Sequence, residues 1–109
     1  QQNGVTVVTG VLPIDASDAK DLVFKVREAN PSHLLCVIGT TAGNKPLLSV
    51  MLSDDLVKEH NLNAGAMVRE AAKLIKGGGG GQPHYASAGG KDLEGLNAAI
   101  EKVIELAQL

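Results

Sequence analysis

The chain has 109 residues, a mass of 11.2 kDa and a formal charge of −2, and 44% of its residues are hydrophobic but only 2% aromatic. This length suits one domain, and this hydrophobic content is enough for a core, which excludes a globally disordered chain. No apolar run approaches the roughly 18 residues of a membrane-spanning helix, so we expect no membrane contact. The scarcity of aromatic residues argues against a surface that reads single-stranded bases by stacking.

The first half of the chain predicts a strand, a helix and then two further strands. Residues 5–12 are rich in β-formers, and Asp15 or Ser17 can cap a helix that ends before Pro31. Residues 34–40 are nearly all apolar without alternation, which predicts a central strand covered on both faces. A turn then leads into a strand at 46–52, and these two strands are expected to form a hairpin.

The second half predicts helices around a glycine run. A short acidic helix is expected at 54–60 and a longer one at 64–76, and a final helix begins at Asp92 after a short extended stretch at 85–88. The order is therefore β-α-β-β-α-α, then a glycine loop, a short strand and a helix. This order predicts a compact α/β fold, with a single layer of mixed sheet and helices, in one domain over residues 1–109.

Patterns that would carry catalysis or bind a metal are missing. His33, His60 and His84 are far apart in the sequence, and none has ligand spacing to another histidine or to Cys36. Ser87 lacks the flanking glycines of a nucleophile elbow. We predict no catalytic residue and no metal site. The single cysteine is interpreted as a small buried hydrophobic residue, which favours an intracellular, reducing compartment.

The most informative feature is a run of five glycines, Gly77, Gly78, Gly79, Gly80 and Gly81. It follows a predicted helix and matches neither the dinucleotide fingerprint nor the P-loop. Ordering each glycine costs roughly 0.5–1 kcal/mol more than ordering alanine. The run is therefore expected either to stay mobile until a ligand arrives or to let a ligand approach its bare N–H groups, which suit phosphate oxygens. On this view Gly79→Val weakens binding more than stability.

Basic residues lead into the glycines. Arg69, Lys73 and Lys76 fall at i, i+4 and i+7 of the predicted helix and share one face, with no acid expected to neutralise it. With Lys91 beyond the run, the segment 69–91 carries a net charge of +3 on a chain of −2. We interpret this segment as a site for a phosphate backbone, and a solvated surface stripe is the alternative.

The segment from Lys76 to Lys91, KGGGGGQPHYASAGGK, resembles the GGGGGRPxxAxAGG signature near the end of bacterial alanyl-tRNA synthetases. Residues 7–12, 56–73 and 94–100 are similar to that family too. The resemblance implies the C-terminal, DHH-associated domain (C-Ala), which docks the outer corner of tRNA and supports aminoacylation and editing. Gln82 and His84 stand where the family has Arg and Asp; we include both among the candidate RNA contacts.

The resemblance also sets the expected partners. It implies a non-catalytic fragment of a longer cytoplasmic ligase. The expected partners are tRNA, the other synthetase domains and a second copy of the enzyme, which would dimerise through an upstream helix. ATP with magnesium and the zinc of the editing domain belong to other parts of such an enzyme, so no cofactor is expected here. Two alternatives remain: the substrate-binding domain of a DHH-type phosphoesterase, and a purely structural packing or dimerisation domain.

Overall fold

The computed structural model describes residues 4–59 and 61–107. Its strands are β1 (Thr6–Leu12), β2 (Leu34–Thr40), β3 (Leu47–Leu52), β4 (Gly78–Gly81) and β5 (Tyr85–Gly89). Its α-helices are α1 (Ala16–Ala29), α2 (Asp54–Glu59), α3 (Ala64–Ala72) and α4 (Leu96–Ala107). Short 3₁₀ turns cover Ala42–Asn44, Lys73–Ile75 and Leu93–Gly95.

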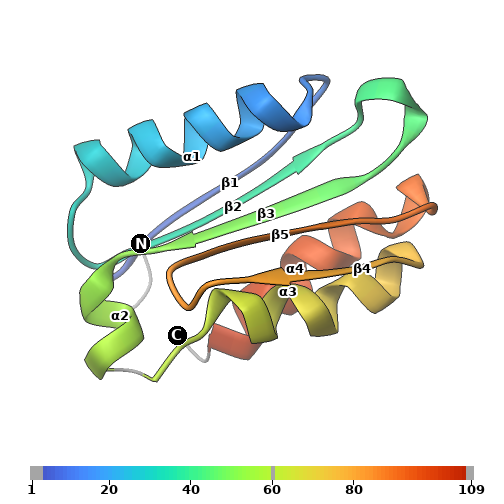
Figure 1. Ribbon diagram of the computed structural model, residues 1–109. Helices are drawn as coiled ribbons and strands as arrows, with labels where there is room; N and C mark the ends of the chain where they lie inside the picture. Colours follow the sequence, from blue (N-terminus) through green and yellow to red (C-terminus); the bar gives the residue numbers. More distant parts are fainter. Residues whose placement is uncertain (1–3, 60, 108–109) are drawn as a thin grey trace.

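The five strands form one mixed sheet in the order β1-β2-β3-β5-β4. β1 and β2 are parallel, and every other neighbouring pair is antiparallel. The predicted fold class, a single layer of mixed sheet with helices, is confirmed (Figure 1). Within the described residues no helix has the length and apolarity to cross a membrane.

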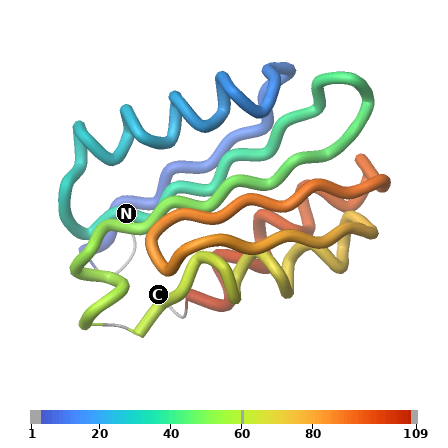
Figure 2. Tube along the Cα trace, in the orientation of Figure 1, coloured from blue at the N-terminus to red at the C-terminus, as the bar shows by residue number. Residues whose placement is uncertain are grey.

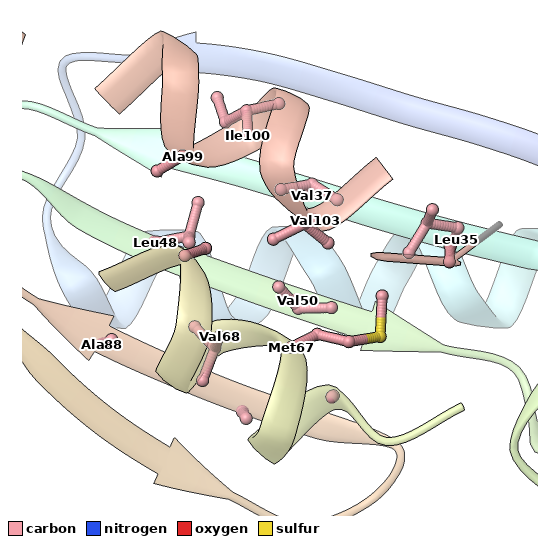
Figure 3. Packing of buried hydrophobic residues seen from close by; sticks show 14 of the residues in the cluster. Leu35, Val37, Leu48, Val50, Met67, Val68, Ala88, Ala99, Ile100 and Val103 are labelled. Carbon is pink, nitrogen blue, oxygen red and sulfur yellow. The ribbon is translucent and has the colours of Figure 1, made fainter. Parts of the chain in front are cut away.

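Helices cover the two faces of the sheet unequally. α1 lies on one face, while α3 and α4 lie on the other (Figure 2). All seven residues of β2 are buried between these layers, which explains why its sequence shows no alternation. Leu35 and Val37 point into the larger core with α3 and α4 (Figure 3), whereas Leu34, Cys36 and Ile38 pack toward α1.

Local signals place α1 as the sequence predicts. The Asp15 side chain accepts a hydrogen bond from the backbone N–H of Asp18, at 2.9 Å, and so caps the helix. The helix ends at Ala29, two residues before Pro31, because proline disfavours helical backbone in the residue before it. Val23 and Ala19 are fully buried against the sheet, so α1 is fixed over β2 and β3.

The glycine run is a strand, and the prediction of a loop is wrong for residues 78–81. Gly78 pairs with Gly89 and Gly80 with Ser87, which makes β4 the edge strand of the sheet. A β-carbon at Gly79 would collide with the carbonyl oxygen of Ser87, and one at Gly81 would lie 2.8 Å from the carbonyl oxygen of Tyr85. β4 therefore lies so close to β5 that Gly79 and Gly81 leave no room for a side chain. The preference of glycine for loops does not reveal this close pairing.

The helix predicted at 64–76 is shorter than expected. α3 ends at Ala72, a 3₁₀ turn follows, and Lys76 has left-handed backbone with φ 53° and ψ 47°. Lys76 therefore does not continue the helical face of Arg69 and Lys73. The turn is held by a 2.9 Å hydrogen bond from Gly77 N–H to the Ala72 carbonyl, which directs the chain back along α3 into β4.

Candidate nucleic-acid interface

Three lysines from separate parts of the sequence surround one cavity. Lys45 comes from the β2–β3 connection, Lys76 from the turn after α3 and Lys91 from the turn after β5. The cavity measures about 420 Å³, and its lining also includes Asp15, the N-cap of α1, and Ala16, the first residue of that helix. We call this site the lysine cavity. Two of its lysines, Lys76 and Lys91, were predicted from the sequence, and Lys45 was not.

Backbone hydrogen bonds bring these three segments together. Gly90 N–H donates to the carbonyl of Pro46 at 3.0 Å, which ties the turn after β5 to the residue next to Lys45. The N–H groups of Lys91 and Asp92 both donate to the Ile75 carbonyl, at 2.8 and 3.0 Å, which ties that turn to the residue next to Lys76. The convergence of the lysines is therefore built into the main chain.

The lysine cavity carries a net positive charge, because its lining holds three lysines and one aspartate. The ion pairs within residues 4–59 and 61–107 involve Arg27, His33, Lys73 and Lys102, and none involves a lysine of the cavity. The one carboxylate at the rim, Asp15, caps α1. The N-terminal end of α1 adds partial positive charge beside the lysines. An anion is the ligand that this arrangement suits.

A face almost without side chains extends from the cavity along β4 and β5. Ala86 and Ala88 pack into the core under α3 and α4, so Ser87 and Gly89 face the α1 side, as do their partners Gly80 and Gly78. Nothing lies within 4 Å of a β-carbon placed on Gly78 or Gly80. We call this surface, made of Gly78, Gly80, Ser87 and Gly89, the glycine shelf.

A second hollow, of about 330 Å³, lies at the other end of the shelf. Its lining comes from the middle of α1, from β4 and β5 and from the turn between them: Lys20, Phe24, Gly80, Gly81, Gln82, His84, Tyr85, Ala86 and Ser87. Ala16 at the cavity and Lys20 and Phe24 at this hollow are spaced by four residues, so one stripe of α1 borders both sites. We call this hollow the aromatic hollow. Lys20 and Phe24 are not among the site residues predicted from the sequence, although their spacing of four residues is a helical signal that the sequence contains.

The predicted site residues fall into four groups. Lys76, Gly77 and Lys91 line the lysine cavity, and Gly80, Gly81, Gln82 and His84 line the aromatic hollow. Gly78 and Gly79 lie between them on β4. Arg69 and Lys73 lie on the exposed side of α3 and line neither site.

The prediction of a purely basic face on α3 is wrong. Lys73 Nζ lies 3.3 Å from a carboxylate oxygen of Glu70, three residues earlier, so this lysine is partly neutralised. Of the three basic residues predicted to share one helical face, Lys76 lies beyond the helix, Lys73 is paired with Glu70, and Arg69 remains. The stronger concentration of free positive charge is the lysine cavity.

The backbone amides of the glycine run are also less available than expected. In an antiparallel ladder alternate residues direct their N–H groups to the partner strand. Gly77 N–H donates to the Ala72 carbonyl of α3, and the Gly81 carbonyl oxygen lies next to Gly65 of α3. The odd-numbered glycines therefore direct their backbone N–H and C=O groups away from β5. Successive N–H groups therefore do not converge on one phosphate, and the shelf offers close approach of the backbone instead.

Groups that would support catalysis are not gathered at either site. Among the described residues no three His, Cys, Asp or Glu side chains are grouped so as to hold a metal ion. Burial raises the pKa of the Cys36 thiol to about 12, and the side chain lies in the core, as predicted. Burial also raises the pKa of Tyr85 above its ordinary value, against the opposing effect of a hydrogen bond with the Ser87 side chain.

Comparison with known proteins identifies the class of domain. The family model described as "DHHA1 domain" matches residues 4–109, and the chain belongs to this family. Alanine–tRNA ligases are similar to it in sequence. The ligase of Bacteroides fragilis is 54% identical over 105 residues, and that of Bacteroides thetaiotaomicron is 52% identical over the same length. The alignment covers 96% of this chain but only 12% of each ligase.

A solved structure has the same fold. The C-Ala domain of the alanyl-tRNA synthetase from Aquifex aeolicus superposes with a TM-score of 0.84 and 24% sequence identity, covering 96% of this chain and 93% of that one. The resemblance seen in the glycine signature is thus supported by the family model and by the sequence relatives, and the solved structure shows that the fold is shared.

Proposed function

We propose that this chain is a non-catalytic tRNA-binding domain at the C-terminal end of an alanine–tRNA ligase. It docks the outer corner of tRNA and so supports aminoacylation and editing by other domains of the same enzyme. Those domains would use ATP with magnesium and an editing zinc, and this one needs no cofactor. The sequence similarity to alanine–tRNA ligases supports the assignment to such an enzyme.

The observation that carries the binding role is the lysine cavity opening onto the glycine shelf. Lys45, Lys76 and Lys91 form no ion pair with any described residue, although the chain has a net negative charge. An RNA backbone is polyanionic, and the shelf, whose one side chain is the small Ser87, lets it come close to these lysines. Phosphates at the cavity would position the RNA, while the shelf accepts the adjoining strand.

The test is the affinity of an alanine tRNA transcript for charge variants at low salt. The triple variant Lys45→Ala, Lys76→Gly, Lys91→Ala is expected to bind at least about tenfold more weakly, because it loses the contacts to phosphate. A double variant of exposed lysines outside the cavity, Lys25→Ala with Lys58→Ala, serves as the matched control and is expected to bind nearly as well as the unmodified chain.

Arg69 and Lys73 are tested separately by the variant Arg69→Ala with Lys73→Ala. We propose that they form an outer contact beyond the cavity, so their removal is expected to weaken binding less than the cavity triple. Undiminished binding by the cavity triple would contradict the proposed site. Absence of binding by the unmodified chain would favour a packing or dimerisation role, and a preference for short oligonucleotides over tRNA would favour the phosphoesterase alternative.

A further inference from the structure

The only phenylalanine and the only tyrosine of the chain meet at the aromatic hollow. The ring centroids of Phe24, from α1, and Tyr85, from β5, are 5.2 Å apart, and the ring planes are inclined by 54°. Both side chains are half-buried and pack against the smaller core between α1 and the sheet. One side of the pair thus belongs to the core, and the other lines the hollow.

The glycine strand leaves this pair uncovered. Gly80 lies beside Ser87 on the face of the sheet that also carries Tyr85, and the space where its side chain would project is empty. Any larger residue at position 80 would extend over the hollow. On this face α1 lies over β2 and β3, and the β4–β5 hairpin lies beyond it at the other edge of the sheet, as Figure 1 shows. The hollow is therefore a consequence of the same glycines that form the shelf.

The wall of the hollow opposite α1 is polar and held in place. Gln82 has an amide that both donates and accepts hydrogen bonds, and His84 has an imidazole. Their turn is fixed by the Gln82 N–H to Tyr85 carbonyl bond at 2.9 Å, by Leu52 N–H to the His84 carbonyl at 2.7 Å and by Ala64 N–H to the Pro83 carbonyl at 2.8 Å. Lys20 adds a positive charge at the rim.

We propose that the aromatic hollow takes a single unstacked nucleobase of the bound RNA. The base would lie against the Phe24 and Tyr85 rings, with its polar edge toward Gln82 and His84, while the phosphates on the adjoining strand follow the glycine shelf to the lysine cavity. Aromatic faces combined with side chains that donate and accept hydrogen bonds are how proteins hold bases that have left a stack. This inference rests on the proposed RNA-binding function and adds a base-binding subsite to it.

The test compares two probes of the same length and charge. One is oligouridine, whose bases are largely unstacked, and the other is a ribose–phosphate strand without bases. The readout is the aromatic NMR spectrum of the full chain, in which Phe24 and Tyr85 are the only phenylalanine and tyrosine and tryptophan is absent. Oligouridine is expected to change the chemical shifts of both rings and to bind roughly tenfold more tightly than the abasic strand.

Two leucine variants provide the comparison. Gly80→Leu puts a side chain over the hollow, and Thr9→Leu puts the same side chain at an exposed position of β1 that lines neither the hollow nor the lysine cavity. Gly80→Leu is expected to remove the ring shifts and the preference for oligouridine, and Thr9→Leu is expected to keep both. Thermal unfolding of each variant checks that the fold is intact.

The outcomes separate this inference from the proposed function. Equal binding of the two probes without ring shifts would overturn the nucleobase subsite and leave phosphate binding at the lysine cavity standing. Ring shifts that persist in Gly80→Leu would also overturn it, because the hollow would then not be the site of contact. Failure of both probes to bind at low salt would contradict the proposed RNA-binding function itself.

Discussion

Two kinds of glycine alternate along residues 77–81. A β-carbon at Gly77, Gly79 or Gly81 would collide with the backbone of the β5 segment, whereas one at Gly78 or Gly80 would meet nothing within 4 Å. The first kind is needed for the close pairing of β4 with β5. The second kind is compatible with a side chain and keeps the shelf bare. The glycine signature thus combines a packing requirement with a surface property.

This division leads to opposite effects of the same substitution at adjacent positions. Gly79→Ala is expected to destabilise the fold by about 1–3 kcal/mol, because the methyl group is forced into the β5 backbone. Gly80→Ala is expected to be neutral or to stabilise by about 0.4–1 kcal/mol, because alanine restricts the unfolded chain. Chemical denaturation measures both. Equal effects at the two positions would contradict the geometry of β4. The sequence-based expectation that Gly79→Val affects binding more than stability is not supported by this geometry.

The stability of the fold alone would not favour lysine at position 76. Its left-handed backbone is costly for a residue with a β-carbon, and glycine would adopt it freely. Lys76→Gly is therefore expected to keep or raise the free energy of unfolding, by up to about 1 kcal/mol, while tRNA binding weakens. Lys76→Ala removes the same charge without relieving the backbone, so it should weaken binding alike and bring no gain in stability. Unchanged affinity in Lys76→Gly would show that the lysine serves no contact.

At the scale of elements, β4 is the part that differs most from the sequence-based prediction. Local composition favoured a mobile loop, because five glycines have no side chains to pack and a high conformational entropy. The strand forms nonetheless, since β5 provides a ladder on one side and α3 approaches on the other, with Gly65 close to the Gly81 carbonyl. These are contacts between distant segments, which local propensity does not contain.

Amide hydrogen exchange distinguishes the strand from the loop. Because Gln82 N–H bonds to the Tyr85 carbonyl, alternation along the ladder directs the amides of Gly78 and Gly80 toward β5 and those of Gly79 and Gly81 away from it. The amides of Gly78 and Gly80 are expected to exchange more slowly than those of Gly79 and Gly81. Uniformly fast exchange over residues 78–81 would restore the prediction of a loop.

The remaining elements show which signals in the sequence are sufficient. The Asp15 cap, the Pro31 stop and the unalternating run of β2 each act locally, and each predicted its element correctly. Two of the three lysines of the lysine cavity could be predicted from the sequence. Lys76 and Lys91 flank the glycine signature, but Lys45 joins them only through the Gly90 to Pro46 hydrogen bond, which depends on the order of strands in the sheet.

At the scale of the whole molecule, charge distribution matters more than total charge. The chain carries −2 overall, and this value gives no indication of a polyanionic partner. Folding gathers three lysines at one end of the sheet, next to the start of α1, and leaves them without acidic partners among the described residues. We propose that this local positive field on an otherwise acidic domain attracts RNA to one surface and orients it there.

We propose that a few phosphates seated at the lysine cavity hold the RNA. Binding through three or four phosphates releases their counterions, so the logarithm of tRNA affinity should fall with the logarithm of salt concentration at a slope of roughly −3 to −4. Titrating alanine tRNA at several salt concentrations measures this slope directly. We expect a slope in that range for the unmodified chain and one shallower by about 1 for Lys76→Gly. A slope near zero in the unmodified chain would contradict the claim.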